Sequence, residues 1–263
     1  MYSVRMSRRP KTHHGGRDLS IRDKAYLYIQ HLIAQGTLPA GGGISELLLA
    51  KELGSSRTPV REAMNQLSAE GLLQQSPSGG MVVAQLSRED IIELYELREA
   101  LEVYAVGKVA CVPMRDTDKV RLQNLVDEIV VLQKELKKSK LTHLDAKQME
   151  RFIGCDLGFH ALLMSMTHNS RLQKIINDTR LLMSIFAIHV EGHDYGTLGN
   201  VRDYHQRILD AVVQQSPEAA KIGLIEHIQA SQRERLNAFD HWKRETSLRN
   251  STPAFLEFRR PKQ

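Results

Sequence analysis

Asp156 and His160 stand four residues apart in the apolar run FIGCDLGFHALL, residues 152–163. In a helix this spacing places both side chains on one face. Phe152, Phe159 and Leu163 share that face, so the carboxylate and the imidazole point toward a protein interior. A buried charge without a partner is costly. The pattern therefore predicts that both side chains contact a further polar or ionic partner.

Two other histidines occupy apolar faces in segments with helical periodicity. His205 lies at helical spacing from the apolar residues Ile208, Leu209 and Val212. His227 follows the small residues Ala220 and Gly223, whose size would leave room beside the ring. Both histidines are therefore expected to project into the same interior as the first pair.

Three neutral imidazoles and one carboxylate suit a divalent transition metal such as Zn²⁺, Ni²⁺ or Mn²⁺. Helices that project ligands into a bundle core are a common way to build such a site. The predicted ligands are Asp156, His160, His205 and His227. The alternative is that each histidine is simply hydrogen-bonded within the core. His189 and His193 lie in a segment interrupted by glycines, which is expected to be a loop and to hold no ligand.

Composition sets the limits for the rest of the chain. The 263 residues predict one large or two ordinary domains, and a net charge of +5 permits nucleic-acid binding without proving it. The two cysteines, Cys111 and Cys155, fit a reducing compartment, so a cytoplasmic protein is expected. No apolar run approaches about 20 residues, so no membrane span is expected.

The N-terminal third has the pattern of a winged helix-turn-helix. Helical spacing over 21–33, a short helix around 47–53 and a helix from 55 to about 70 precede two β-prone runs joined by a turn, residues 72–83. We expect a disordered basic tail at 1–18 and a DNA-binding domain at 19–85. SPSGG would form the tip of the wing.

The remainder is predicted to be an all-helical bundle at 86–245, followed by a tail at 246–263, so the fold class is mainly α. Ser87 is the expected N-cap of its first helix. Ser216 and Pro217 give a clear start for the last helix. Further helices are expected at about 116–138, 147–167, 170–190, 199–215 and 217–242.

The predicted recognition helix starts in SSRTPVREAMNQL. Arg57 and Arg61 are four residues apart, opposite the apolar face of that helix, where guanidinium groups can bind guanine edges or phosphates. Ser56 and Thr58 can donate hydrogen bonds to phosphates at the helix start. Two arginines on a surface helix do not by themselves indicate DNA binding, since any surface helix can carry such a pair.

The wider string resembles the winged-helix domain of GntR-type transcription regulators through SE-x-x-LA (45–50), LG-x-SRTPVREA (53–63) and L-x-x-EGLL (67–73). The resemblance covers about sixty residues and implies DNA contacts at Ser56, Arg57, Thr58, Arg61 and Gly80. Two positions depart from the family pattern, because Leu47 and Gly79 stand where basic side chains are common. Fewer basic groups predict weaker DNA binding, or reliance on the basic tail.

A second resemblance covers the C-terminal part, which is similar to the FCD effector domain of the FadR-like branch of this family. The matching pieces are ELYELREALE (93–102), D-x-x-x-H (156–160), YHQRILDAV (204–212) and EHI (226–228). The resemblance implies that the Asp and three His residues hold a divalent metal and that a small carboxylate effector binds to it. Arg98 would help to bind that effector; the alternative is a surface arginine paired with Glu102.

The sequence therefore predicts a ligand-responsive transcription regulator, acting as a homodimer on a palindromic DNA operator. Repression relieved by a small organic acid is the expected sign, by resemblance only. A metalloenzyme that uses the same residues is the alternative, although no general base stands out and Glu226 is expected to face away. A general architectural DNA binder is a third reading. No catalytic residue is predicted.

Overall fold

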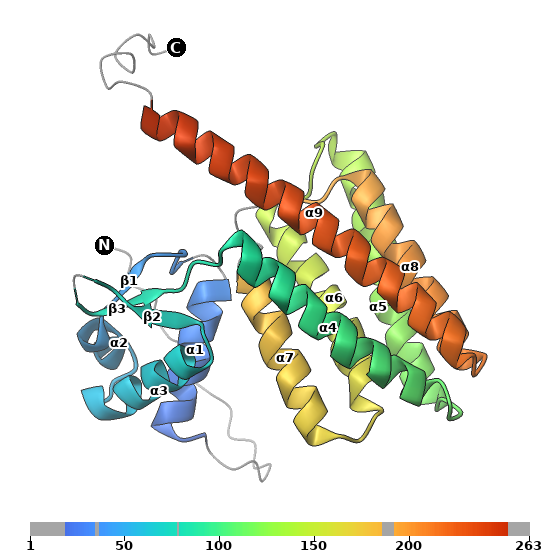
Figure 1. Cartoon of the computed structure of the whole chain (residues 1–263), viewed down its shortest axis with the longest axis horizontal. Helices are drawn as coiled ribbons and strands as arrows, with labels where there is room; N and C mark the ends of the chain where they lie inside the picture. Colours follow the sequence, from blue (N-terminus) through green and yellow to red (C-terminus); the bar gives the residue numbers. More distant parts are fainter. Residues whose placement is uncertain (1–18, 35–36, 78, 186–191, 252–263) are drawn as a thin grey trace, which may run out of the picture.

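The computed structural model describes residues 19–34, 37–77, 79–185 and 192–251. Figure 1 shows a small domain of helices and short strands beside a larger group of helices. We call the first part, from α1 to β3, the winged-helix domain and the second, from α4 to α9, the helical bundle. The expected fold class, mainly α with an N-terminal winged helix and a C-terminal bundle, is confirmed.

The winged-helix domain contains the three helices and the hairpin that the sequence predicts. Its elements are α1 (Ile21–Ala34), β1 (Gly43–Ile44), α2 (Glu46–Glu52), α3 (Arg57–Ala69), β2 (Leu73–Gln75) and β3 (Met81–Val83). The three strands form an antiparallel sheet in the order β1-β3-β2, with Gln74 opposite Val82 in the hairpin. Strand β1 was not predicted from the sequence. It has only two residues, which are too few to show an alternation of apolar and polar side chains, so its pairing with β3 leaves no signal in the sequence.

The core of this domain lies between the inner faces of α1 and α3. Ala25, Ile29 and Ile33 of α1 are fully buried. They pack in one cluster with the predicted inner face of α3, residues Val60, Ala63, Met64 and Leu67. Burial of that face leaves the opposite side of α3 on the surface, which is where DNA contacts were expected.

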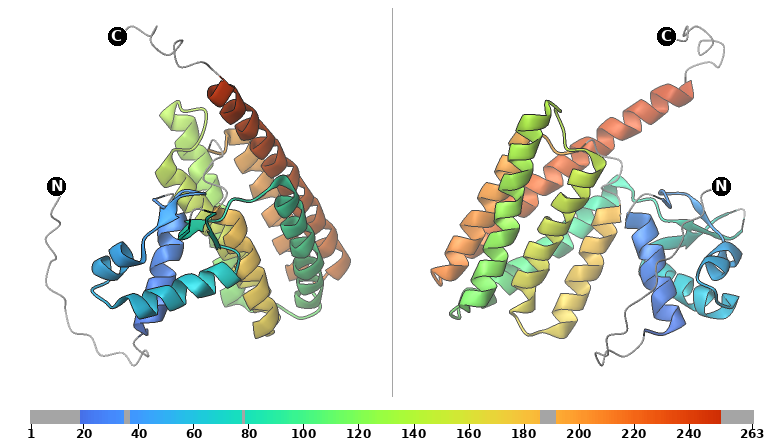
Figure 2. Two further views of the ribbon diagram at one scale, coloured as in Figure 1. Left: turned by 60° about the vertical axis from the view of Figure 1, so that its left-hand side comes forward. Right: turned by 180° about the vertical axis from the view of Figure 1, so that it is seen from behind.

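The helical bundle consists of α4 (Arg88–Val109), α5 (Asp116–Ser139), α6 (Ala146–Ser165), α7 (Ser170–Ile185), α8 (Tyr195–Val213) and α9 (Pro217–Ser251). Contacts run from α4 to α9, then to α8, α5, α6 and α7, and back to α4. The six helices therefore close a ring around a shared interior (Figure 2). In the part of the chain that the structure describes, no helix is long and apolar enough to cross a membrane.

Most predicted helix ends agree with the structure, and the exceptions have local causes. Ser87 caps α4 in a capping box with Asp90, as expected for its first turn. Helix α8 starts at Tyr195 rather than 199, because the side chain of Asp194 accepts the Thr197 backbone N–H and so starts the helix before the predicted position. Helix α9 continues to Ser251, so residues 246–251 of the predicted tail are helical. The predicted tail segments 1–18 and 252–263 lie outside the described residues.

The two domains contact one another at α7. On this helix, Leu182 packs against the core of the winged-helix domain, and a Cβ added to Gly71 would lie 3.9 Å from Leu182 Cδ2. Within the bundle, Arg88 at the start of α4 pairs with α9, where its Nε lies 3.3 Å from Asp240 Oδ1. The bundle thus touches the winged-helix domain through α7 as well as through the connecting chain.

Candidate metal centre and DNA-binding surface

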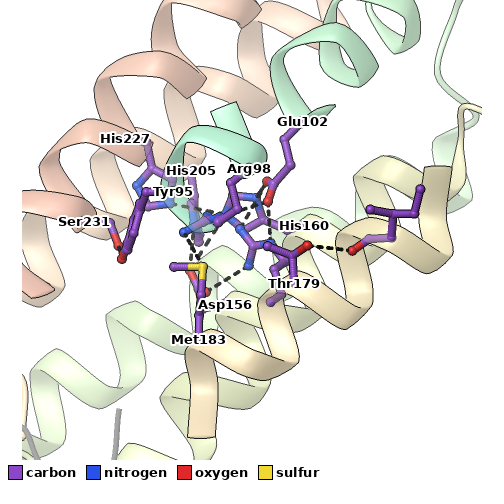
Figure 3. A network of polar contacts seen from close by, with 12 residues as sticks. Tyr95, Arg98, Glu102, Asp156, His160, Thr179, Met183, His205, His227 and Ser231 are labelled. Carbon is purple, nitrogen blue, oxygen red and sulfur yellow. Dashed lines mark hydrogen bonds and ion pairs between the residues drawn. The ribbon is translucent and has the colours of Figure 1, made fainter. Parts of the chain in front are cut away.

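The four predicted metal ligands converge inside the bundle. Asp156 and His160 come from α6, His205 from α8 and His227 from α9. One ligand atom from each residue lies within 4.8 Å of the others. The three histidines are buried and Asp156 is half-buried. Figure 3 shows their side chains pointing toward one another.

The spacing of the donor atoms fits a metal ion. His160 Nε2 lies 3.2 Å from His227 Nε2, and His205 Nε2 lies 3.4 Å from Asp156 Oδ1. Nitrogen and oxygen ligands at about 2.0–2.2 Å from a Zn²⁺ ion are about 3.0–3.5 Å from one another. These two pairs of donors are therefore already at separations close to those of a coordinated set, while His160 Nε2 and Asp156 Oδ1 are 3.8 Å apart.

His205 gives the clearest sign that a partner belongs here. Both of its ring nitrogens are buried, and among the described residues neither has a hydrogen-bond partner, although Nε2 lies 3.4 Å from Asp156 Oδ1. The ring is fixed by stacking on Phe159, with centroids 4.2 Å apart and planes 5° apart. A buried polar atom without a partner costs about 1–3 kcal/mol. A metal ion on Nε2 would satisfy that atom, whereas the alternative of a hydrogen-bonded core histidine does not describe His205.

Glu102 of α4 fixes the protonation of His160. Its carboxylate Oε2 lies 2.8 Å from His160 Nδ1. Burial and the nearby Arg180 lower the pKa of His160 to about 3, against the opposite effect of Glu102, so the ring is neutral near pH 7. Because Nδ1 donates its proton to the carboxylate, Nε2 presents a lone pair to the cluster. Such a carboxylate behind a metal-binding histidine orients the ring and raises its basicity.

Two buried arginines hold Glu102 in turn. Arg98 Nε lies 3.0 Å from Oε1, and Arg180 Nε lies 2.8 Å from the same oxygen. Burial alone would raise the pKa of Glu102, but Arg180 and Arg98 hold it well below its ordinary value. Arg180 Nη1 also lies 3.3 Å from Asp156 Oδ2, which helps keep that carboxylate ionised.

Arg98 points inward, as its helical face predicts. It does pair with Glu102 at i+4, but both side chains are buried, so the alternative of a surface pair is wrong. Two buried residues of this network were not predicted as part of the site, the acceptor Glu102 and the second arginine, Arg180. Glu102 could have been found, since it lies one turn beyond Arg98 on the same face. Arg180 had a weaker signal of the same kind, because it stands at helical spacing with the apolar residues Ile176 and Met183.

A cavity of about 510 Å³ opens beside the cluster. Its lining includes the polar side chains of Arg98, Arg180, Asp156 and His227. Apolar side chains also line it, including Met149, Phe152 and Ile153 of α6, Met183 of α7 and Val201 of α8. The cavity is large enough for a small organic molecule in reach of the cluster.

Three secondary expectations can be compared with this geometry. His193 is not one of the clustered ligands; its Nδ1 lies 2.9 Å from Glu234 Oε1 at the cavity wall. His189 lies outside the described residues. Gly223 does not leave open room beside His227, because a Cβ there would lie 3.4 Å from Ile208 Cγ1. Its small size lets α8 and α9 approach closely. Glu226 faces away and pairs with Arg207.

The predicted DNA-contacting arginines lie on the exposed side of α3. The side chains of Arg57 and Arg61 are 59% and 56% exposed. Both pair with Glu46 of α2, through contacts of 3.0 Å from Arg57 Nη2 and 2.9 Å from Arg61 Nε. One carboxylate therefore holds the two guanidinium groups side by side, where DNA phosphates would compete for them.

The remaining predicted contacts also lie on the surface. Ser56 is the N-cap of α3 but makes no capping hydrogen bond, so its hydroxyl is available, and Thr58 is exposed in the first turn. Gly80 lies in the wing turn with φ +83°, a conformation that favours glycine. Leu47 is 65% exposed on α2, so this departure from the family pattern puts an apolar side chain on the surface.

Comparisons with known proteins agree with both domains. A winged helix joined to a helical domain with an internal ligand cavity defines a class of DNA-binding transcription regulators. The model of bacterial regulatory proteins of the gntR family matches residues 21–83, and the FCD domain model matches residues 93–230. The chain belongs to the GntR family and carries an FCD domain, as the sequence resemblance implied.

The relatives of the chain are transcription regulators. The HTH-type transcriptional regulator YdhC of Bacillus subtilis is 29% identical over 202 residues, which are 77% of this chain and 85% of that protein. A protein of Paenarthrobacter nicotinovorans named "Probable D-xylose utilization operon transcriptional repressor" is 29% identical over 75% of this chain and 81% of its own length. Since the relatives are regulators and not enzymes, the metalloenzyme alternative is rejected.

A solved structure supports the fold as a whole. Escherichia coli McbR/YncC matches with a TM-score of 0.69 and 21% sequence identity. The match covers 84% of this chain and 100% of the other. The arrangement of a winged helix before a helical bundle is therefore shared.

Removal of the carboxylate ligand should remove the metal. We expect elemental analysis of the untagged protein to find about one equivalent of a transition metal. Asp156→Ala should lose it, because the variant would leave the ion's charge buried among three neutral imidazoles with no negative ligand to offset it. Asp203→Ala is the matched control, since that side chain is 63% exposed. Absence of metal from the wild type after reconstitution with Zn²⁺, Ni²⁺ and Mn²⁺ would refute the site.

Loss of the carboxylate behind His160 should weaken the metal without removing it. For Glu102→Gln we expect the Kd of the metal to rise about 10–100-fold, because the ring loses its orienting acceptor. Competition with a chromophoric chelator measures it. Glu128→Gln, which breaks an ion pair of half-exposed side chains with Arg151, is the control. An unchanged Kd in a Glu102→Gln protein of lower melting temperature would show that Glu102 only stabilises the fold.

Arg61 offers a direct test of the DNA-binding surface. With a binding site selected from random DNA by the wild type, Arg61→Ala should raise the Kd about 5- to 150-fold if the guanidinium reads a base, or lower the salt slope by about one if it contacts a phosphate. Fluorescence anisotropy at several salt concentrations separates these outcomes. Arg207→Ala removes an equally exposed arginine from the bundle and should change neither quantity.

Proposed function

We propose that the protein is a transcription repressor that acts as a homodimer on a palindromic operator and responds to a small carboxylate. Ser56, Arg57, Thr58, Arg61 and Gly80 contact the DNA. The carboxylate binds a divalent metal (Zn²⁺, Ni²⁺ or Mn²⁺) held by the cluster of Asp156 and the three histidines, with Arg98 at its side. The observation that carries the proposal is this cluster beside a cavity that Asp156 and His227 help to line, inside a domain joined to a winged helix.

Charge favours an anionic ligand. Without a metal, the positive charges of Arg98 and Arg180 are balanced by the negative charges of Glu102 and Asp156. Histidines bind a metal through neutral rings and so add none; burial also lowers the pKa of His160 and His227 below their ordinary value. A divalent cation therefore leaves an excess of two positive charges in a largely buried site. A carboxylate, which is also a good ligand for these metals, offsets that excess.

Helix α7 supplies a physical connection between the cavity and the DNA-binding domain. Arg180 contacts Glu102 and Asp156 inside the bundle. Leu182, two residues further on, packs against the winged-helix core. A ligand that binds Arg180, or displaces Asp156 from it, changes the contacts of α7 and thereby favours one placement of the winged-helix domain. Such a ligand shifts operator binding only by its difference in affinity for the two placements.

The sign of the response is taken from the family. The P. nicotinovorans relative is named a repressor of a utilization operon, which fits repression that a ligand relieves. An architectural DNA binder would have no use for a buried cluster and a cavity. The metal would supply positive charge and open coordination positions, while the protein side chains orient the ligand.

An effector screen tests this function. With metal-loaded protein and the selected operator, we expect at least one mono-, di- or hydroxycarboxylate to change the operator Kd about 5- to 150-fold, and its uncharged amide to have no effect. Phenanthroline, a chelator without a carboxylate, should abolish the response and leave ligand-free DNA binding intact. A response that survives chelation would refute binding on the metal.

Leu182 tests the proposed connection. Leu182→Ala should still bind metal and the carboxylate, but its operator affinity should respond less to the ligand. Ile175→Ala removes an apolar side chain of the same helix that is 47% exposed, and should respond as the wild type does. An unchanged response in Leu182→Ala would place the connection elsewhere.

A further inference from the structure

Two adjacent leucines of α2 are exposed, although that helix packs into the winged-helix domain. Leu47 is 65% exposed and Leu48 is 61% exposed. The two residues that follow them, Leu49 and Ala50, are buried. The core therefore uses the inner side of α2 and leaves the two leucines outside. In Figures 1 and 2, α2 lies at the end of the winged-helix domain away from the helical bundle, so the bundle does not cover them either.

Leu47 stands beside the arginines that are proposed to contact DNA. Its neighbour Glu46 reaches α3, where the carboxylate lies 3.0 Å from Arg57 Nη2 and 2.9 Å from Arg61 Nε. In a helix-turn-helix, the helix before the recognition helix crosses the DNA backbone, next to the major groove that the recognition helix enters. The leucine at the start of α2 thus extends the DNA-facing surface of α3 with an apolar side chain.

The two leucines lie on different sides of α2. Leu48 shares a side with Glu52 at i+4, and the Glu52 carboxylate accepts a hydrogen bond of 3.1 Å from the hydroxyl of Tyr28 on α1. Leu47 instead shares a side with the exposed Lys51. The side that holds Leu48 is therefore turned toward α1. The side that holds Leu47 is turned away from α1 and carries a positive charge that suits a phosphate.

The major groove offers one apolar group to such a side chain. Thymine presents its C5-methyl group there, and apolar side chains contact it, whereas the other three bases carry no methyl group. A leucine has neither a hydrogen-bond donor nor an acceptor. Against the edge of any other base it would remove water from polar atoms without replacing the hydrogen bonds. The chemistry of the side chain therefore selects thymine.

We propose that Leu47 determines operator specificity by packing against a thymine methyl group in each half-site, beside the bases or phosphates that Arg57 and Arg61 contact. Lys51, one turn further along α2, binds a phosphate of the adjoining backbone, and Leu48 does not touch the DNA. The inference rests on the DNA-binding surface in the proposed function and goes beyond it, because it assigns one base of the operator to one side chain.

Replacement of thymine by deoxyuridine tests this contact, because it removes the methyl group and keeps every hydrogen-bonding atom of the base. The operator is the one that the wild type selects from random DNA. At one thymine of each half-site, we expect deoxyuridine to raise the Kd of the wild type about fourfold, as the loss of one buried methyl group predicts. In Leu47→Ala the same replacement should leave the Kd unchanged. Fluorescence anisotropy measures all four values of this double-mutant cycle.

Leu48→Ala is the matched control, since it removes a neighbouring leucine of similar exposure on the side of α2 that faces α1. It should keep the full penalty for deoxyuridine. Leu47→Met keeps an apolar side chain of similar volume and should also keep the penalty, whereas Leu47→Gln should lose it. Because Leu47 is exposed, none of these substitutions opens a cavity in the core, and circular dichroism verifies the fold.

The contrary outcomes are distinct. An equal penalty for deoxyuridine in the wild type and in Leu47→Ala would overturn the role of Leu47, and so would a penalty that is lost in Leu48→Ala instead. A Kd that deoxyuridine changes at no thymine would overturn the methyl contact. These results would leave the proposed DNA-binding surface standing as long as Arg61→Ala weakens binding. A wild type that selects no operator would overturn the proposed function and this inference together.

Discussion

The carboxylate of Glu102 is the contact on which the arrangement of the bundle interior depends. It accepts hydrogen bonds from Arg98 on its own helix, from His160 on α6 and from Arg180 on α7. A buried carboxylate is tolerated only when such partners satisfy it. Because its partners come from three helices, one carboxylate sets the tautomer of His160, a proposed metal ligand, and contacts α7. The cluster of Asp156 and the three histidines is thus connected through a single buried group to the helix that touches the winged-helix domain.

The sequence predicted the part of the site that follows from local periodicity. Asp156, His160, His205 and His227 each stand on an apolar helical face, and helices with buried faces bring such residues together. Arg180 was missed although it stands at helical spacing with Leu172, Ile176 and Met183, because its partners are distant in sequence and only the fold shows that a buried carboxylate receives it. Strand β1 was missed for a similar reason, since two residues become a strand only through their pairing with β3. Local patterns identify helices and faces, whereas long-range polar pairing requires the fold.

The winged-helix domain has a similar arrangement of one carboxylate and two arginines at its surface. Glu46 pairs with Arg57 and Arg61, as Glu102 pairs with Arg98 and Arg180 in the bundle. The side chains of Arg57 and Arg61, however, are open to solvent. Exposed ion pairs contribute about 0–1 kcal/mol, so DNA phosphates can replace the carboxylate at little cost. Burial makes the inner network a fixed framework, and exposure makes the outer one exchangeable. Residue type alone does not separate these two roles.

Helix α7 has one further consequence, for how the ligand preference of such a protein changes in evolution. Several apolar side chains that line the cavity, including Met149, Ile153 and Val201, come from α6 and α8. Helix α7 lines the cavity with Met183 and contacts the winged-helix domain with the neighbouring Leu182. Substitutions on α6 and α8 can therefore reshape the cavity without altering the α7 surface that faces the DNA-binding domain, whereas a substitution at Met183 can affect both. A lineage can exchange one ligand for another without rebuilding the output, so new chemical inputs can be acquired by few mutations.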